Sequence, residues 1–454
     1  MTAAPGGPLI AFYGDDFTGS SDALEVLAFA GLKAVMFLAP PTAEMLARFP
    51  GLDAIGVAGD SRGVSVAEMD AAMPAILSAL RDTGAGIVHY KVCSTFDSSP
   101  ETGSIGRIIM IAREIFRNAY TPIVGATPAL ARYCLFGNLF ARSGTDGEVY
   151  RVDRHPIMSV HPVTPMQEGD LARHLAQQAP LQIASLGYPS LDAGEEDARR
   201  ALERIKARKP DCILFDSASS RQLTEVGRLL DEAMHDDAPL FVVGGSGVEY
   251  ALTQWWAETA ARPAAASFDS FDAVERLLVM SGSASRMTAD QIEAAMAAGF
   301  VEVAVDARAL MDGGEAALDR LVAHVLAILE EGRSPLVHTV RGPNDPRIAA
   351  LREAAGLDPA VIGRALGQTM GRALAGIQAH AGLTRIVVSG GDTSSQAVQV
   401  LGPDALEIAA RLAPGVPLCR MHAAGRPTVD GVEIALKGGQ MGGIDFFERA
   451  RTGR

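Results

Sequence analysis

Two adjacent carboxylates, Asp15 and Asp16, lie between an apolar run and a helix-like segment near the start of the chain. Residues 10–13 have the apolar character of a buried strand, and apolar residues from 23 onward recur with helical spacing. The turn between them carries hydroxyls, carboxylates that can accept from hydroxyls, and a helix N-terminus that can hold an anion. Because ligands of open α/β sheets bind outside the carboxyl ends of strands, we expect a site for a polyhydroxylated ligand here. The alternative is an ordinary cluster of N-cap residues.

Further polar residues follow two other predicted strands of the first half, 54–58 and 86–89. Arg62 follows the first strand and could form a bidentate pair with a substrate carboxylate, although a surface arginine is common. Lys91 and Asp97 follow the second, where Lys91 would act as a point charge on an anion. The hydroxyl groups nearby that could contact the same ligand belong to Ser94, Thr95 and Ser98. The alternative is a turn in which Asp97 and the serines bond to their own backbone.

Glycine-rich turns follow three predicted strands of the second half, 277–280, 385–388 and 433–436. Small residues let backbone amides approach a phosphate, so three such turns in one domain predict a nucleotide site. The candidate contacts are Ser281, Gly282, Ser283 and Ser285 in the first turn, Gly390, Gly391, Asp392 and Thr393 in the second, and Gly439 in the third. None of the turns is a Walker A loop or a G-x-G-x-x-G fingerprint. Arg341, after a further polar strand end, either touches phosphates or has a structural role.

The elements that would position these residues alternate between short strands and amphipathic helices. This alternation predicts an α/β fold with mostly parallel sheets flanked by helices. A linker-like stretch at 260–269 interrupts the alternation, which then restarts, so we expect two domains, 1–265 and 266–454. The segment 135–165 is expected to be an excursion that packs over the substrate site.

Composition limits the class of protein. The 454 residues are too many for one typical core, and 48% hydrophobic with 21% charged residues is ordinary for a globular protein. A net charge of −14 argues against a nucleic-acid partner. We expect no signal peptide, no membrane span and four reduced cysteines, hence a cytoplasmic protein.

The motifs, taken together, resemble the four-carbon acid sugar kinase family. Gly-Asp-Asp-Phe-Thr-Gly-Ser, Lys-Val-Cys-Ser-Thr-Phe-Asp-Ser-Ser, His-Pro-Val-Thr-Pro-Met, Ser-Gly-Gly-Asp-Thr-Ser and Lys-Gly-Gly-Gln-Met-Gly-Gly occur in the family's order across nearly the whole chain. The resemblance implies a sugar acid bound in the N-terminal domain, ATP bound in the C-terminal domain, and phosphorylation of the terminal hydroxyl of threonate, erythronate or 3-oxo-tetronate. Family nucleotide contacts match Ser281–Ser285, Gly390–Thr393 and Gly439. The chain differs from the family pattern at Gly59-Asp60, where Thr-Glu is expected before Ser-Arg. This difference affects only the detailed contacts expected with the substrate.

The hypothesis is therefore an ATP-dependent kinase for a small sugar acid. Arg62 and Lys91 would hold the substrate carboxylate, and Asp16, or else Asp97, would accept the hydroxyl proton. The glycine turns would bind ATP phosphates bridged by Mg²⁺, whose protein ligands stay unassigned. The expected partners are the small acid and ATP, and a homo-oligomer is compatible with the sequence. Two alternatives are an NAD(P)-dependent oxidoreductase acting on similar acids and a non-catalytic sugar-acid sensor.

Overall fold

The computed structural model describes residues 7–144, 147–160, 164–234, 238–259, 268, 270–349 and 359–454, without the side chains of 359–361 and 392. Contacts between residues divide the chain into two compact units, 1–266 and 267–454. The predicted boundary at 265 lies in a stretch, 260–267, outside the described residues and stays a prediction. Each unit has an α/β architecture, as the sequence predicts.

Parallel strands form the sheet of the first unit. In spatial order they are β2 (Ala34–Phe37), β3 (Ala54–Ala58), β1 (Ile10–Gly14), β4 (Ile87–Lys91), β11 (Leu240–Gly244), β5 (Thr121–Val124), β10 (Cys212–Phe215) and β9 (Ile183–Leu186). Most of these strands are buried along their whole length, which explains why they appear in the sequence as continuous apolar runs. The pairing of Gly14 with both Ala58 and Lys91 brings the carboxyl ends of β1, β3 and β4 to one edge.

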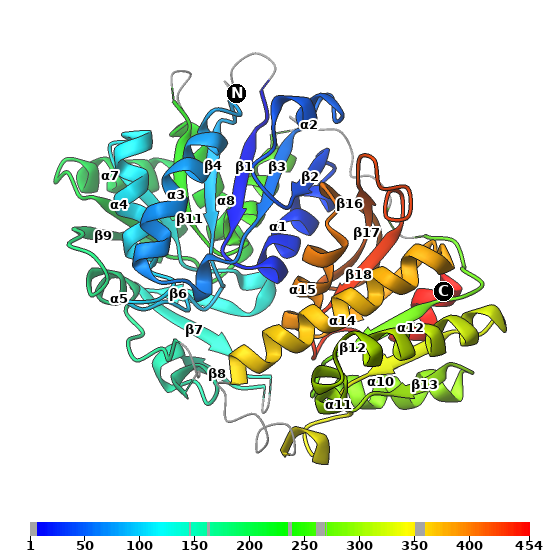
Figure 1. The fold of residues 1–454 in the computed structure, drawn as a ribbon. Coiled ribbons are helices and arrows are strands. Elements are labelled where there is room, and N and C mark those ends of the chain that lie inside the picture. The colour runs from blue at the N-terminus through cyan, green and yellow to red at the C-terminus, as the bar shows by residue number, and fades with distance from the viewer. Residues whose placement is uncertain are drawn as a thin grey trace. The chain divides into compact units, whose positions relative to one another are not determined.

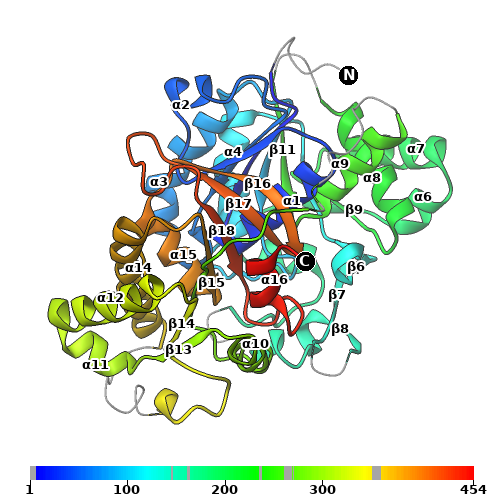
Figure 2. The ribbon, with the colours of Figure 1, turned by 90° about the vertical axis from the view of Figure 1, so that its right-hand side faces the viewer.

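Helices cover both faces of this sheet. They are α1 (Phe17–Phe29), α2 (Ala43–Ala47), α3 (Val66–Arg81), α4 (Ile105–Phe116), α5 (Leu171–Ala176), α6 (Tyr188–Asp192), α7 (Glu195–Lys206), α8 (Ser220–Glu232) and α9 (Gly247–Glu258). Helix α9 packs on α1 and α8, whereas α3 packs on α4. Figure 2 shows α3 and α4 on one side of β11 and α8 and α9 on the other.

A separate antiparallel sheet is inserted between β5 and α5. It consists of β6 (Arg132–Leu135), β7 (Asn138–Arg142) and β8 (Val149–Arg151). Backbone bridges join it to the main body of the unit, between Cys134 and Ser217 and between Thr127 and Arg132. The sequence predicts an excursion over 135–165 but not these strands, which are short and only partly apolar.

The second unit has a mixed sheet. Strands β13 (Val301–Ala304), β14 (Pro335–His338), β12 (Leu278–Ser281), β15 (Arg385–Ser389) and β18 (Glu433–Lys437) are parallel, and β17 (Val416–His422) and β16 (Ala405–Ala413) continue antiparallel. Its helices include α10 (Arg286–Ala297), α11 (Ala307–Asp312), α12 (Gly314–Glu330), α14 (Pro359–Ala381), α15 (Gly391–Leu401) and α16 (Phe446–Thr452). Helix α14 (gold in Figure 1) packs on α12 and α15, and α10 packs on α16.

The structure also bears on two expectations from the sequence, which concern disulfides and membrane-spanning helices. No disulfide joins the four cysteines, all of which lie among the described residues. Within the described part of the chain, no helix combines the length and apolarity needed to cross a bilayer.

Candidate active site

Arg62 joins the two adjacent carboxylates at the edge of the first unit's sheet. Its Nε and Nη2 donate to Asp15 Oδ2 at 3.2 Å and Oδ1 at 2.7 Å, and its Nη1 lies 2.9 Å from Asp16 Oδ2. Burial raises the pKa of Asp15, and Arg62 opposes that shift. Burial disfavours the charged form of Arg62, yet the carboxylates beside it raise its pKa. All three guanidinium nitrogens are engaged, so substrate binding by Arg62 stays a prediction and would require an exchange of partners.

Asp16 caps helix α1. Its Oδ1 accepts from Gly19 N at 2.7 Å, which satisfies one unpaired amide of the first turn. A Cβ on Gly19 would lie 2.5 Å from Asp16 Oδ1 and 3.0 Å from Lys91 Nζ, so glycine lets the buried ammonium approach the helix start. Asp16 is therefore an N-cap residue, as one of the two interpretations of the sequence predicts. It also lies close to the cations Arg62 and Lys91.

Lys91 belongs to a buried polar group that sequence reasoning missed. Burial raises the pKa of Asp22 in α1, and Lys91 opposes that shift. Glu249 also raises the pKa of Asp22, and its Oε1 lies 2.6 Å from His89 Nδ1, with neither side chain exposed. Two sequence signals could have pointed to this group. Asp22 lies at the start of a largely apolar helical segment, and the apolar strand β4 contains His89 and ends at Lys91.

The three candidate hydroxyl residues after β4 have different neighbours. Ser94 flanks Gly245, where an added Cβ would lie 3.2 Å from Ser94 Cα. Thr95 Oγ1 lies 3.0 Å from Cys93 Sγ. Ser98 Oγ instead donates to Phe96 O and lies 2.9 Å from His174 Nε2, with Gln178 Nε2 donating to it. Ser98 thus bonds to its own loop backbone, as the alternative of a structural turn predicts. It also contacts His174 in α5 and Gln178 just after that helix.

Asp97 is buried in the same loop. Its Oδ1 is shielded from water and has no hydrogen-bond partner among the described residues. A buried acceptor left without a partner costs free energy, so a functional explanation is warranted.

The three glycine-rich turns of the second unit meet at one edge of its sheet. Gly282 N donates to Ser389 O and Gly390 N to Lys437 O, which links the ends of β12, β15 and β18. A Cβ on Gly282 would collide with Thr393 Oγ1, and a Cβ on Gly390 would lie 3.3 Å from Ser283 N. Gly390, at φ +115, precedes α15, and no described side chain caps this helix start, so its first amides can bind an anion.

Gly439 completes this cluster. Its carbonyl accepts from Ser285 Oγ and from Thr288 Oγ1, and a Cβ on it would lie 2.7 Å from Ser283 Oγ. Gly391 has open space around its Cα, and the side chain of Asp392 lies outside the described residues. The structure thus brings together the other predicted nucleotide contacts, and their use by a nucleotide stays a prediction.

Lys437 is fully buried beneath these turns. Its Nζ donates to Gly438 O at 3.0 Å, Thr288 Oγ1 at 3.2 Å and Gly439 O at 3.3 Å. Burial lowers the pKa of Lys437 to about 8. Lys437 was not among the predicted contacts, although a cation at the end of an apolar strand is a sequence signal that could have pointed to it.

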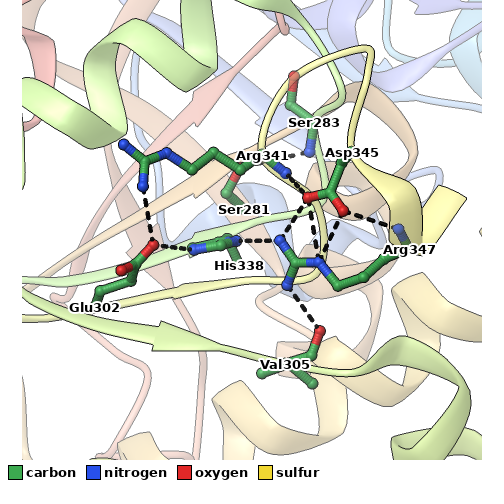
Figure 3. A network of polar contacts seen from close by, with 8 residues as sticks. All are labelled: Ser281, Ser283, Glu302, Val305, His338, Arg341, Asp345 and Arg347. Atoms are coloured by element: carbon green, nitrogen blue, oxygen red, sulfur yellow. Dashed lines mark hydrogen bonds and ion pairs between the residues drawn. The ribbon is translucent and has the colours of Figure 1, made fainter.

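A charged network lies beside the first turn, at the ends of β13 and β14 (Figure 3). His338 Nε2 lies 2.9 Å from Glu302 Oε1, and Arg347 pairs with Asp345 at 2.6 Å. Burial lowers the pKa of His338. Arg341 Nη1 lies 3.4 Å from Glu302 Oε1. This ion pair agrees with the structural role that the sequence left open for Arg341.

Comparisons with known proteins cover both units. Residues 10–252 match a sugar-binding N-terminal domain, and residues 278–447 match a nucleotide-binding C-terminal domain. The chain is 44% identical to the 3-oxo-isoapionate kinase of Paraburkholderia graminis, over 100% of this chain and 96% of that protein. It is 31% identical to the 3-oxo-tetronate kinase of Burkholderia multivorans, over 99% of this chain and 98% of that protein.

Two solved structures have the same fold. A Salmonella typhimurium LT2 protein superposes with a TM-score of 0.79 at 28% identity, over 97% of this chain and 98% of that one. A Haemophilus influenzae protein gives a TM-score of 0.75 at 26% identity, with the same coverage. The family matches confirm the resemblance noted from the motifs: the chain belongs to the four-carbon acid sugar kinase family and is a sugar-acid kinase, a phosphotransferase.

Proposed function

We propose that this enzyme transfers the terminal phosphoryl group of ATP to the terminal hydroxyl of a small sugar acid in carbohydrate-acid catabolism. The observation that carries the proposal is the 44% identity, over the whole chain, to a 3-oxo-isoapionate kinase. The candidate substrates are 3-oxo-isoapionate first, then 3-oxo-tetronate, threonate and erythronate. The nucleotide-domain match and the kinase relatives favour this activity over an oxidoreductase or a sensor. Since the reaction consumes ATP, we expect a cytoplasmic enzyme.

Asp16 is the proposed general base. It lies at the carboxyl edge of a parallel sheet and at a helix N-terminus, which is where this fold class binds ligands. Its Oδ2 contact with Arg62 fixes the carboxylate, while Asp15 holds the other side of the guanidinium. Lys91, close to the same helix start, supplies positive charge for an anionic substrate. A carboxylate held in this way can accept the proton of a substrate hydroxyl as that oxygen attacks phosphorus.

The second unit has the chemistry that ATP requires. Glycines at 282, 390 and 439 remove side chains where a Cβ would fill the space between the turns. Uncapped amides at the start of α15 and the hydroxyls of Ser283 and Thr393 can donate to phosphate oxygens. Bound ATP supplies the phosphoryl group, and kinase chemistry leads us to propose Mg²⁺ with it. Among the described residues, no group of three or more His, Cys, Asp or Glu side chains is arranged to hold a metal ion.

The proposal is tested by ADP release with Mg²⁺ and ATP. The acids are 3-oxo-isoapionate, the two enantiomers of 3-oxo-tetronate, threonate and erythronate, each with and without enzyme. We expect one 3-oxo acid to give clear turnover and a KM well below those of the others. ADP release that is the same with and without every acid would contradict the proposal.

A further inference from the structure

Two buried polar atoms in the first unit have complementary chemistry and no partner. Among the described residues, Arg132 Nε donates to nothing and Asp97 Oδ1 accepts from nothing, and both are shielded from water. Native structures leave few such groups, and each one calls for an explanation such as a missing ligand. Here one atom is a charged donor and the other a charged acceptor.

Among the described residues, hydrogen bonds hold the guanidinium of Arg132 from one side only. Its Nη1 donates to Leu130 O at 2.8 Å, Ala131 O at 3.3 Å and Arg142 O at 3.5 Å. This leaves the Nε–Nη2 edge, for which no hydrogen bond or ion pair is found among the described residues. That edge carries two parallel N–H groups and matches the two oxygens of a carboxylate.

Arg132 lies next to the loop that carries Asp97. Its backbone bridges to Thr127, and Thr127 Oγ1 and Ser94 Cα both approach Gly245, at 3.3 Å and 3.2 Å from an added Cβ. Burial lowers the pKa of Arg132, and Cys93 and Asp97 are the strongest groups that oppose this shift. The arginine, the acid and the hydroxyls after β4 therefore share one neighbourhood.

We propose that the Nε–Nη2 edge of Arg132 and Oδ1 of Asp97 form the subsite for the hydroxy-carboxylate end of the substrate. The substrate carboxylate accepts from Arg132, and the hydroxyl on the neighbouring carbon donates to Asp97. This inference rests on the proposed function and refines it. Arg132, not Arg62, is the carboxylate anchor, because Arg62 is already paired with Asp15 and Asp16. Asp97 binds the substrate, which leaves Asp16 as the base.

Steady-state kinetics of Arg132→Met, Arg132→Lys and Asp97→Asn test the subsite, with 3-oxo-isoapionate, 3-oxo-tetronate and the carboxamide of whichever acid the wild type uses. Arg132→Met should raise the KM of the acid by about 10- to 100-fold, the range of one charged hydrogen-bonding contact, and should change kcat by less than about threefold. Its preference for the acid over the carboxamide should disappear. Arg132→Lys, which keeps the charge, should restore part of the acid preference.

Asp97→Asn separates binding from catalysis. A binding role predicts a KM raised by about 10-fold at nearly unchanged kcat, whereas loss of a general base lowers kcat by about 100-fold or more. Arg142→Met is the matched control, because Arg142 is an exposed arginine on the adjacent strand. Its kinetics should equal those of the wild type.

An unchanged acid KM in Arg132→Met, or a kcat loss in Asp97→Asn at unchanged KM, would overturn the subsite. Circular dichroism and ATP affinity equal to those of the wild type establish that each variant is folded. Calorimetric binding of the acid, without ATP, separates this inference from the kinase proposal. Wild-type binding that is lost in Arg132→Met supports the subsite even where no ADP forms, whereas equal binding by both proteins refutes it.

Discussion

Lys437 should couple nucleotide binding to proton uptake. It is a fully buried ammonium whose hydrogen-bond partners are two carbonyls and one hydroxyl, all uncharged. Burial lowers its pKa from 10.5 to about 8, and no ion pair of Lys437 is found among the described residues. This decrease in pKa corresponds to a free-energy cost of about 3 kcal/mol for the charged form of Lys437. An anionic phosphate placed against the turn at Gly439 would favour the charged form and raise the pKa again.

The sign and size of the effect follow from that pKa. In the nucleotide-free protein, roughly one tenth of Lys437 is neutral at pH 7 and roughly nine tenths at pH 9. Nucleotide binding that restores the charge should therefore take up about 0.1 proton at pH 7 and about 0.9 proton at pH 9. ATP affinity should fall by about tenfold per pH unit above pH 8, because protonation must then accompany binding.

The assay is isothermal titration calorimetry of ATP binding in buffers of different ionisation enthalpy, at pH 7 and pH 9. Lys437→Met should bind ATP more weakly at pH 7 and should show no extra proton uptake at pH 9. Lys206→Met, which changes a partly exposed lysine of α7 that pairs with Glu203, is the control and should behave as the wild type does. Equal proton uptake by wild type and Lys437→Met at pH 9 would refute the reasoning.

Three further predictions concern single side chains. Asp16→Asn should lower kcat by about 100-fold or more with ATP affinity unchanged, and a near-normal kcat in steady-state assays would remove Asp16 from the role of base. Gly282→Ala should weaken ATP binding measured by calorimetry, because its Cβ would collide with Thr393 Oγ1, whereas Gly144→Ala, with open space around it, should not. Ser98→Ala should lower the free energy of unfolding in urea by about 1–3 kcal/mol, because it removes the donor to the buried Phe96 O and the contacts of Ser98 Oγ with His174 and Gln178. An unchanged urea midpoint would contradict that last expectation.

The sequence predicts the parallel strands and their polar ends well, because both leave local signals. Apolar runs such as 54–58 and 240–244 are buried on both faces, so their residue types alone indicate strands. The glycine turns near Gly282 and Gly390 follow such strands directly, and their meeting at one edge is a consequence of parallel pairing.

The features that the sequence did not reveal depend on contacts between distant segments. Strand β16 consists largely of good helix formers, and its pairing with β17 overrides that propensity. The strands of the inserted sheet are short and carry polar residues at their ends, such as Arg132 and Asn138, so the sequence singles out neither β6 nor Arg132. The pairing of Arg62 with both Asp15 and Asp16 is likewise set by tertiary geometry, which no spacing in the sequence encodes.

Phosphorus NMR of the reaction product tests the central claim most directly. The enzyme is incubated with ATP, Mg²⁺ and 3-oxo-isoapionate or 3-oxo-tetronate. A sugar-acid kinase of the proposed kind predicts a new phosphomonoester signal coupled to the protons of a terminal CH₂ group, formed in step with ADP. ADP that forms only with inorganic phosphate, or a phosphate attached elsewhere on the acid, would contradict the account.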